Sequence, residues 1–99
     1  MIRGTTPTLE FTLPFDTGEL DEAYVSFAQR NEVVLEKTLS ECECIGNKMI
    51  VRLSQEDTLK LRSDQGTEIQ IRARTKGGEA LASNIMRVST ERILKDGVI

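Results

Sequence analysis

Cys42 and Cys44 are separated by a single residue, and they are the only thiols of the chain. Thiolates at this spacing can ligate a soft metal ion or take part in thiol–disulfide exchange. A structural zinc site needs a full tetrahedral set of Cys and His ligands, and the sequence has no His and no third Cys. The pattern therefore favours two reduced, packed thiols over a metal or redox site.

The acidic stretch 16–22 offers carboxylate oxygens around a glycine, which are ligands that suit Ca²⁺. It lacks the regular spacing and the closing Glu of an EF-hand loop, so a solvated turn is the favoured interpretation. Among the 16 acidic residues no pair is marked by a surrounding motif as an acid–base couple, and no glycine-rich phosphate loop is present. We therefore expect no enzyme and no cofactor.

Three arginines are candidate binding residues on one predicted sheet surface. Arg72 and Arg74 point outward from one strand, and Arg87 lies on the adjacent strand. This basic stripe could contact a phosphate or an acidic partner, but Glu68 and Glu79 follow the same hairpin. The alternation of charges favours a solvated face, and a protein-contact face is the alternative.

The composition limits the remaining classes of function. The 99 residues fit one domain, and the net charge of -3 gives no basic excess for nucleic acid. Residues 1–7 have no apolar core of a signal peptide, and no apolar run exceeds three residues, so no membrane segment is expected. We expect a protein that stays in the cytoplasm or leaves it inside a larger assembly.

Alternating apolar and polar residues predict several strands. Three stretches show this pattern most clearly, with inward positions Leu9, Phe11 and Leu13; Ala23, Val25 and Phe27; and Ile69, Ile71 and Ala73, the last within a strand 67–75. A strand 33–37 follows a tight turn at residues 30–31, because Asn tolerates a positive φ. After the glycines 77–78, a final strand runs from about Leu81 to Ile93, with a bulge at residues 83–84.

A two-residue turn at 46–47 predicts its own register, in which Cys44 faces Met49, Cys42 faces Val51, and Glu41 faces Arg52. This register places both cysteines on an apolar face. Ser54 and Asp57 then resemble a capping box, which predicts a helical corner at residues 55–61. Together these elements predict an all-β fold: a single-domain immunoglobulin-like antiparallel β-sandwich of about seven strands over residues 1–99.

Residues 90–99 continue beyond the predicted sandwich and carry Ile93, Leu94, Val98 and Ile99. We expect this segment to fold back as an edge hairpin around residues 96–97 or to dock on a neighbouring molecule by strand addition. The four apolar residues join Arg72, Arg74 and Arg87 as predicted partner-binding residues.

Several segments resemble small prophage-encoded proteins of gram-positive gut bacteria. The similar stretches are GTTPTLEFTLPF (4–15), AYVSFAQ (23–29), VRLSQEDTL (51–59) and the ending from ALAS (80–83) to RILKDG (92–97). The layout is more distantly similar to the N-terminal immunoglobulin-like domain of phage baseplate upper proteins. The long coiled-coil and receptor-binding segments that follow that domain are absent from this chain.

This resemblance implies a non-catalytic component or assembly accessory of a phage tail or baseplate, located in the virion or the bacterial cytoplasm. Its partners would be other phage structural proteins or further copies of itself. The alternative is a β-sandwich that binds carbohydrate on a host surface. Such sites usually stack sugars on exposed rings, and this chain has only Phe11, Phe15, Tyr24 and Phe27.

Overall fold

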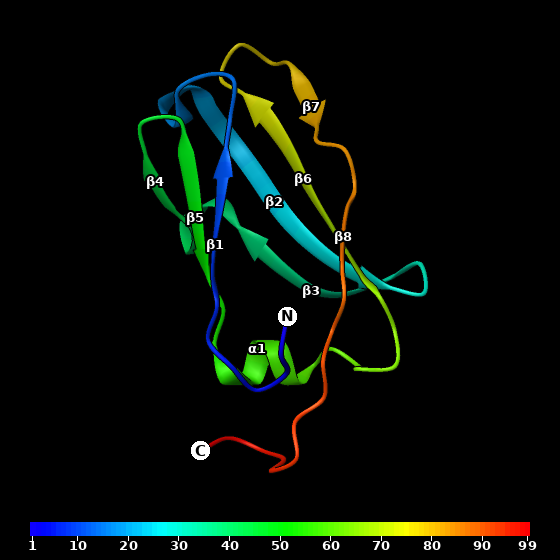
Figure 1. Ribbon diagram of the computed structural model, residues 1–99. Coiled ribbons are helices and arrows are strands. Elements are labelled where there is room, and N and C mark those ends of the chain that lie inside the picture. Colours follow the sequence, from blue (N-terminus) through cyan, green and yellow to red (C-terminus); the bar gives the residue numbers. More distant parts are fainter.

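The computed structural model describes residues 1–99 and consists of two antiparallel sheets that face each other (Figure 1). The smaller sheet has the strand order β1 (Thr8–Thr12), β5 (Lys48–Arg52), β4 (Glu43–Ile45). The larger sheet has the order β3 (Glu32–Thr38), β2 (Leu20–Gln29), β6 (Thr67–Thr75), β7 (Ala80–Ala82), and β8 (Met86–Val88) also pairs with β6. This arrangement confirms the mostly β, sandwich-like part of the predicted fold.

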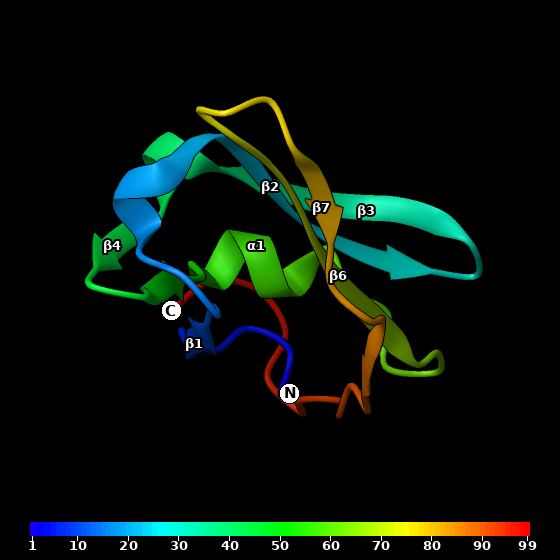
Figure 2. The ribbon, with the colours of Figure 1, turned by 90° about the horizontal axis from the view of Figure 1, so that it is seen from above.

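The helices are short and lie between strands. They are the 3₁₀ turns η1 (Thr17–Glu19) and η2 (Leu39–Glu41) and the α-helix α1 (Gln55–Leu59). In the view from above, α1 appears between β1 and β7 (Figure 2), and Figure 1 shows that it lies below the lower ends of the strands. None of these helices has the length and apolar character needed to span a membrane.

The core forms where the inward positions of the two sheets meet. The predicted positions Ala23, Val25 and Phe27 are at most 1% exposed, which confirms the alternation of β2. Met49 and Val51 of β5 close the core from the smaller sheet and are also fully buried. Burial of apolar surface at about 25 cal/mol per Å² makes these side chains the main source of stability.

The helical corner is confirmed but is shorter than the predicted 55–61, because α1 ends at Leu59. Ser54 Oγ accepts a hydrogen bond of 3.1 Å from the Asp57 N–H, and Asp57 Oδ2 accepts one of 2.9 Å from the Ser54 N–H. This reciprocal capping box satisfies two N–H groups that a helix start otherwise leaves without partners.

The hairpin turns predicted at residues 30–31 and 46–47 are present. Arg30 and Asn31 have φ values of +51° and +63°. A two-residue type I′ turn requires a positive φ at both of its central residues. In the hairpin at residues 46–47, Cys44 faces Met49 as predicted. The pairing ends at Glu43, so the predicted pairs of Cys42 with Val51 and Glu41 with Arg52 are wrong.

The register breaks there because the chain enters η2. Glu41 turns back and accepts a 3.0 Å hydrogen bond from the Thr38 N–H, and Arg52 forms its ion pair with Glu43 instead. Cys44 is exposed although it faces Met49, which corrects the prediction that it is a core residue. β4 is the outer strand of its sheet, and all of its side chains are exposed.

The final strand is interrupted where the bulge was predicted. Arg72 pairs with Ala82 and Ile69 with Met86, so three steps along β6 match four steps along its neighbour. One residue is therefore extra, as in a β-bulge. The predicted continuation to Ile93 is wrong, because strand pairing with β6 ends at Val88.

Candidate interaction surfaces

The three candidate arginines lie on the exposed face of the larger sheet but do not form one stripe. Arg74 is 2.8 Å from Asp21 and 3.1 Å from Glu22, and Arg87 is 3.1 Å from Glu68. Arg72 forms no ion pair with any of these acids. Arg87 faces Glu68, four residues along β6 from Arg72, a separation of about 13 Å in a strand. Arg72 is thus the one candidate arginine whose charge has no intramolecular carboxylate partner.

A shallow pocket of about 260 Å³ adjoins Arg72 and is lined by Glu22, Tyr24 and Arg74 among others. Tyr24 faces Arg72 across the strands, and its hydroxyl donates a hydrogen bond to Glu22. This hydrogen bond and the negative charge of Glu22 raise the pKa of the Tyr24 hydroxyl. The groups around the pocket are largely paired with one another.

The aromatic side chains offer no fully exposed ring for stacking on a sugar. Phe27 is fully buried, and Phe11, Phe15 and Tyr24 are half-buried. Phe11 and Phe15 pack against the core from the smaller sheet and the loop after it.

The acidic stretch 16–22 forms a capped turn. Asp16 Oδ1 accepts a 2.7 Å hydrogen bond from the Gly18 N–H and thereby caps η1. Asp21 and Glu22 point toward Arg74 from the start of β2. No group of three or more His, Cys, Asp and Glu side chains comes together in a way that could hold a metal ion.

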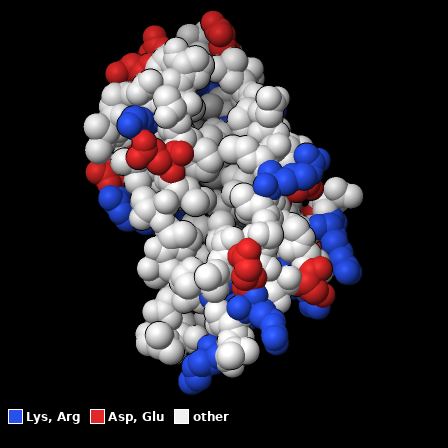
Figure 3. All heavy atoms as spheres, in the orientation of Figure 1, with Lys and Arg blue, Asp and Glu red and all other residues white.

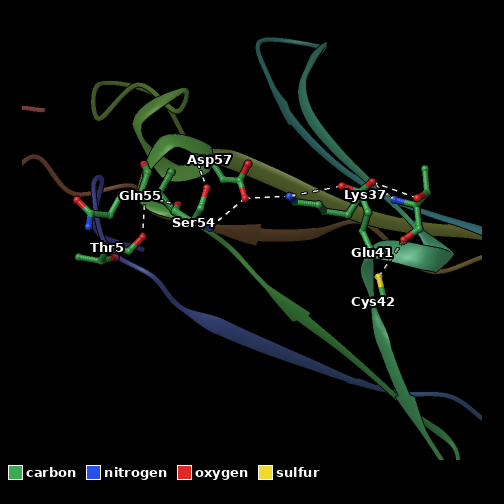
Figure 4. A network of polar contacts seen from close by, with 9 residues as sticks. Thr5, Lys37, Glu41, Cys42, Ser54, Gln55 and Asp57 are labelled. Atoms are coloured by element: carbon green, nitrogen blue, oxygen red, sulfur yellow. Dashed lines mark hydrogen bonds and ion pairs between the residues drawn. The ribbon is translucent and has the colours of Figure 1, made fainter. Parts of the chain in front are cut away.

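The two thiols differ in their surroundings. Cys42 is half-buried against the core, and its Sγ donates to the Thr38 carbonyl at 3.3 Å, as Figure 4 shows. Burial raises the pKa of the Cys42 thiol, and the nearby Cys44 and Glu41 act in the same direction. Cys44 is exposed on β4. Both cysteines are free.

Residues 94–99 expose three large apolar side chains. Leu94 is 90% exposed, Ile99 89% and Val98 53%, whereas Ile93 is half-buried near Gly4. Scattered exposed apolar residues are ordinary, but three within six positions form a concentrated apolar surface.

The predicted edge hairpin around residues 96–97 is wrong. No strand pairing occurs after Glu91, and Ile99 instead bonds with the side chain of Gln55, which donates at 3.1 Å to the Ile99 carbonyl and accepts at 2.8 Å from its N–H. A long ion pair of 3.7 Å joins Arg3 to Asp96. The segment thus lies below α1, as Figure 1 shows.

An apolar groove that the sequence did not predict lies between the two sheets, where β1 and β7 form their unjoined edges. We call it the seam groove, and it has a volume of about 330 Å³. Its main apolar lining is Leu13, Phe15, Met49, Ile71, Ala73 and Leu81. No charged residue lines it, and the upper middle of this face is largely uncharged in Figure 3. The half-buried state of Leu13 and Phe15 reflects this opening.

Gln29 is a structural residue that the sequence analysis missed. It is 3% exposed, and its Nε2 donates to the Arg62 carbonyl at 2.9 Å and to Thr67 Oγ1 at 3.2 Å. Its Oε1 accepts from the Arg62 N–H at 2.9 Å. The signal was its inward position two residues after Phe27, but the alternation alone cannot identify loop partners more than 30 residues away.

Comparisons of the chain with protein-family models, curated proteins and solved structures found no match.

Proposed function

We propose that this protein is a non-catalytic interaction module that acts through protein–protein contacts made by residues 94–99. The observation that carries this proposal is the exposure of Leu94, Val98 and Ile99 on a segment without strand pairing. Burying a large aliphatic side chain is worth about 1.5–3 kcal/mol, so a partner that covers these residues would gain substantial stability.

The strand order supports an immunoglobulin-like topology. In that fold the two sheets have the orders A-B-E-D and G-F-C-C′. The order β1-β5-β4 would then correspond to B-E-D, and β7-β6-β2-β3 to G-F-C-C′, with β7 and β8 as one interrupted strand G. Under this assignment α1 joins E to F, and strand A has no counterpart beside β1.

The biological setting that we propose is the tail or baseplate of a phage or prophage, in the virion or during its assembly in the bacterial cytoplasm. The support is the resemblance of the segments in 4–15, 23–29 and 51–59 together with the proposed topology. The partners would be other phage structural proteins or further copies of this chain. Arg72, whose charge has no intramolecular carboxylate partner, would be a further contact residue, on the exposed face of the larger sheet.

The test is cosedimentation with particles. A tagged chain is expressed in the host bacterium, the prophage is induced, and particles are separated on a density gradient. We expect the wild type to sediment with tails or virions and the Leu94→Asp variant to remain in the soluble fraction. Val33→Asp is the matched control, because Val33 is 56% exposed but lies on β3.

The proposal is overturned if the wild-type chain is absent from particles and from assembly intermediates. It is also overturned if Leu94→Asp sediments like the wild type, since the apolar segment would then have no part in the contact.

A further inference from the structure

We infer that the seam groove of one copy receives residues 94–99 of a second copy, so that chains join head to tail. This inference rests on the proposed function, which makes residues 94–99 the contact segment. It adds the identity of the receiving surface, which is built from the edges of β1 and β7.

The groove is suited to an extended chain because free strand edges border it. In the β1–β5 ladder, the Leu53 N–H bonds to the Pro7 carbonyl and the Leu13 N–H to the Asn47 carbonyl. Backbone groups alternate in direction along an antiparallel strand, so those of Thr8, Glu10 and Thr12 point outward.

The opposite border is built in the same way. The Thr75 N–H bonds to the Glu79 carbonyl and the Ser83 N–H to the Ile71 carbonyl, so the backbone groups of Ala80 and Ala82 point away from β6. Unpaired edges of this kind accept an added strand, while the apolar floor accepts its side chains.

The chain already adds an extended segment at the lower end of this seam. Ile2 forms a parallel bridge with Glu91, in which the Arg3 N–H bonds to the Glu91 carbonyl at 3.1 Å. The Glu91 N–H bonds in turn to the Met1 carbonyl at 2.8 Å. Residues 1–3 therefore occupy the lower seam, and the part between β1 and β7 stays open.

Residues 94–99 have the properties that this opening requires. They are extended or turned, lack ladder partners, and expose Leu94, Val98 and Ile99. Only two of their side chains are charged, Lys95 and Asp96, and these have opposite signs, so the segment brings no net side-chain charge to a groove without charged lining. The side-chain bonds of Gln55 to Ile99 are exposed and can exchange with water when the segment is released.

A second copy is the occupant because the donor and the groove lie at opposite ends of one molecule. The molecule is 47 Å long, with residues 94–99 below α1 and the groove beside β7 at the other end (Figure 1). The segment therefore cannot reach the groove of its own chain. A contact between two different surfaces is heterologous and generates a ring or an open filament. The other two free edges are poorer acceptors, because Glu32, Glu36 and Lys37 lie on β3 and because β4 has only 3 residues.

The experiment uses purified full-length protein and two blocking variants. Leu81→Arg places a charge at the rim of the groove, where Leu81 is 38% exposed, and Leu94→Asp blocks the donor. We expect the wild type to show a mass that rises with concentration in light scattering. Each variant alone should raise the dissociation constant at least about tenfold. Circular dichroism checks that both variants remain folded.

Mixing the two variants gives the decisive result. The Leu94→Asp chain keeps an intact groove and the Leu81→Arg chain an intact donor, so together they can make one contact. We expect a heterodimer at twice the monomer mass and nothing larger. Val33→Arg is the control for a new charge at an exposed apolar position, and it should associate like the wild type.

The inference is overturned if the wild type stays monomeric up to about 1 mM, if Leu81→Arg associates normally, or if the mixture stays monomeric. These outcomes leave the proposed function standing when Leu94 is still required for cosedimentation with particles. If Leu94 were not required for cosedimentation with particles, both the proposed function and this inference would be overturned.

Discussion

Lys37 Nζ lies 2.9 Å from Asp57 Oδ2, so the carboxylate that closes the capping box of α1 is also the ion-pair partner of β3. Figure 4 shows the Lys37 ammonium between Asp57 and Glu41, and its Nζ is 3.8 Å from Glu41 Oε2. The side chains of Lys37 and Asp57 are 16% and 11% exposed. This pair ties the helical corner to the edge of the larger sheet.

The first prediction concerns Lys37→Met, which removes the ammonium but keeps an unbranched apolar stem. Asp57 would keep its bond from the Ser54 N–H but lose its counter-charge in a largely buried position. We expect the free energy of unfolding to fall by about 1–3 kcal/mol, measured by urea denaturation. Lys48→Met is the matched control, because its pair with Glu10 is half exposed and should be worth less than about 1 kcal/mol. Equal effects of the two substitutions would contradict the prediction.

The same pair predicts a dependence of stability on pH. Burial raises the pKa of the Asp57 carboxyl, but hydrogen bonds from the Ser54 N–H and from Lys37 outweigh it and leave this pKa below its ordinary value. The hydrogen bond to Asp57 raises the pKa of Lys37. The carboxylate therefore stabilises the fold fully above its unfolded pKa of about 3.9, and the contribution disappears as the pH falls through the folded pKa.

The lysine contribution is present below the unfolded pKa of about 10.4 and is lost as the pH rises through the higher folded pKa. We therefore expect the stability difference between the wild type and Asp57→Asn to be constant from about pH 5 to 9 and to shrink below about pH 4. Urea denaturation at a series of pH values measures this difference. Parallel profiles down to about pH 2 would show that Asp57 does not titrate with a lowered pKa.

Another prediction concerns the helix cap. Ser54→Ala removes the oxygen that accepts from the Asp57 N–H, and we expect a loss of about 0.5–2 kcal/mol in the free energy of unfolding. Ser63→Ala is the control, because Ser63 is exposed in the following loop and should change stability by less than about 0.5 kcal/mol. An unchanged denaturation midpoint for Ser54→Ala would argue against a stabilising cap.

The sequence predicts best those elements whose signal is local. The structure confirms the alternation in β2 and β6, the turn at Arg30 and the capping box at Ser54. Each of these features depends only on residues that are close together in the sequence. The exposure of Cys44 could not be predicted in this way, since it depends on β4 being the outer strand of its sheet.

The features that the sequence did not predict correctly all depend on residues that are distant in the sequence. Residues 96–97 were expected to form a hairpin, but Ile99 bonds with Gln55, 44 positions away. The seam groove likewise depends on which strands lie at the two sheet edges, and alternation says nothing about strand order. The arginine candidates were placed on the correct face, but their pairing with acids was visible only in three dimensions.

The two thiols should differ in reactivity. Cys44 is exposed, whereas burial raises the pKa of Cys42 and lowers its thiolate fraction. With a chromogenic disulfide reagent at neutral pH, we expect one thiol per native chain to react rapidly and the second much more slowly, and both to react rapidly in denaturant. Cys44→Ser should remove the fast phase and Cys42→Ser the slow one. Two equal rates in the native protein would contradict the structure around Cys42.

The last prediction concerns Gln29, which connects the end of β2 to the loop between α1 and β6. Gln29→Leu would leave the partly buried Arg62 N–H without its acceptor and remove the buried bond to Thr67 Oγ1, and we expect a loss of about 1–3 kcal/mol in unfolding free energy. Amide hydrogen exchange at Arg62 should accelerate by more than the global loss of stability explains, because the loop would open locally. Gln70→Leu is the matched control, since Gln70 is half-buried with one bond to the Ser83 carbonyl that water can replace. If Gln29→Leu were no more destabilising than Gln70→Leu and left exchange at Arg62 unchanged, Gln29 would have no anchoring role in this loop.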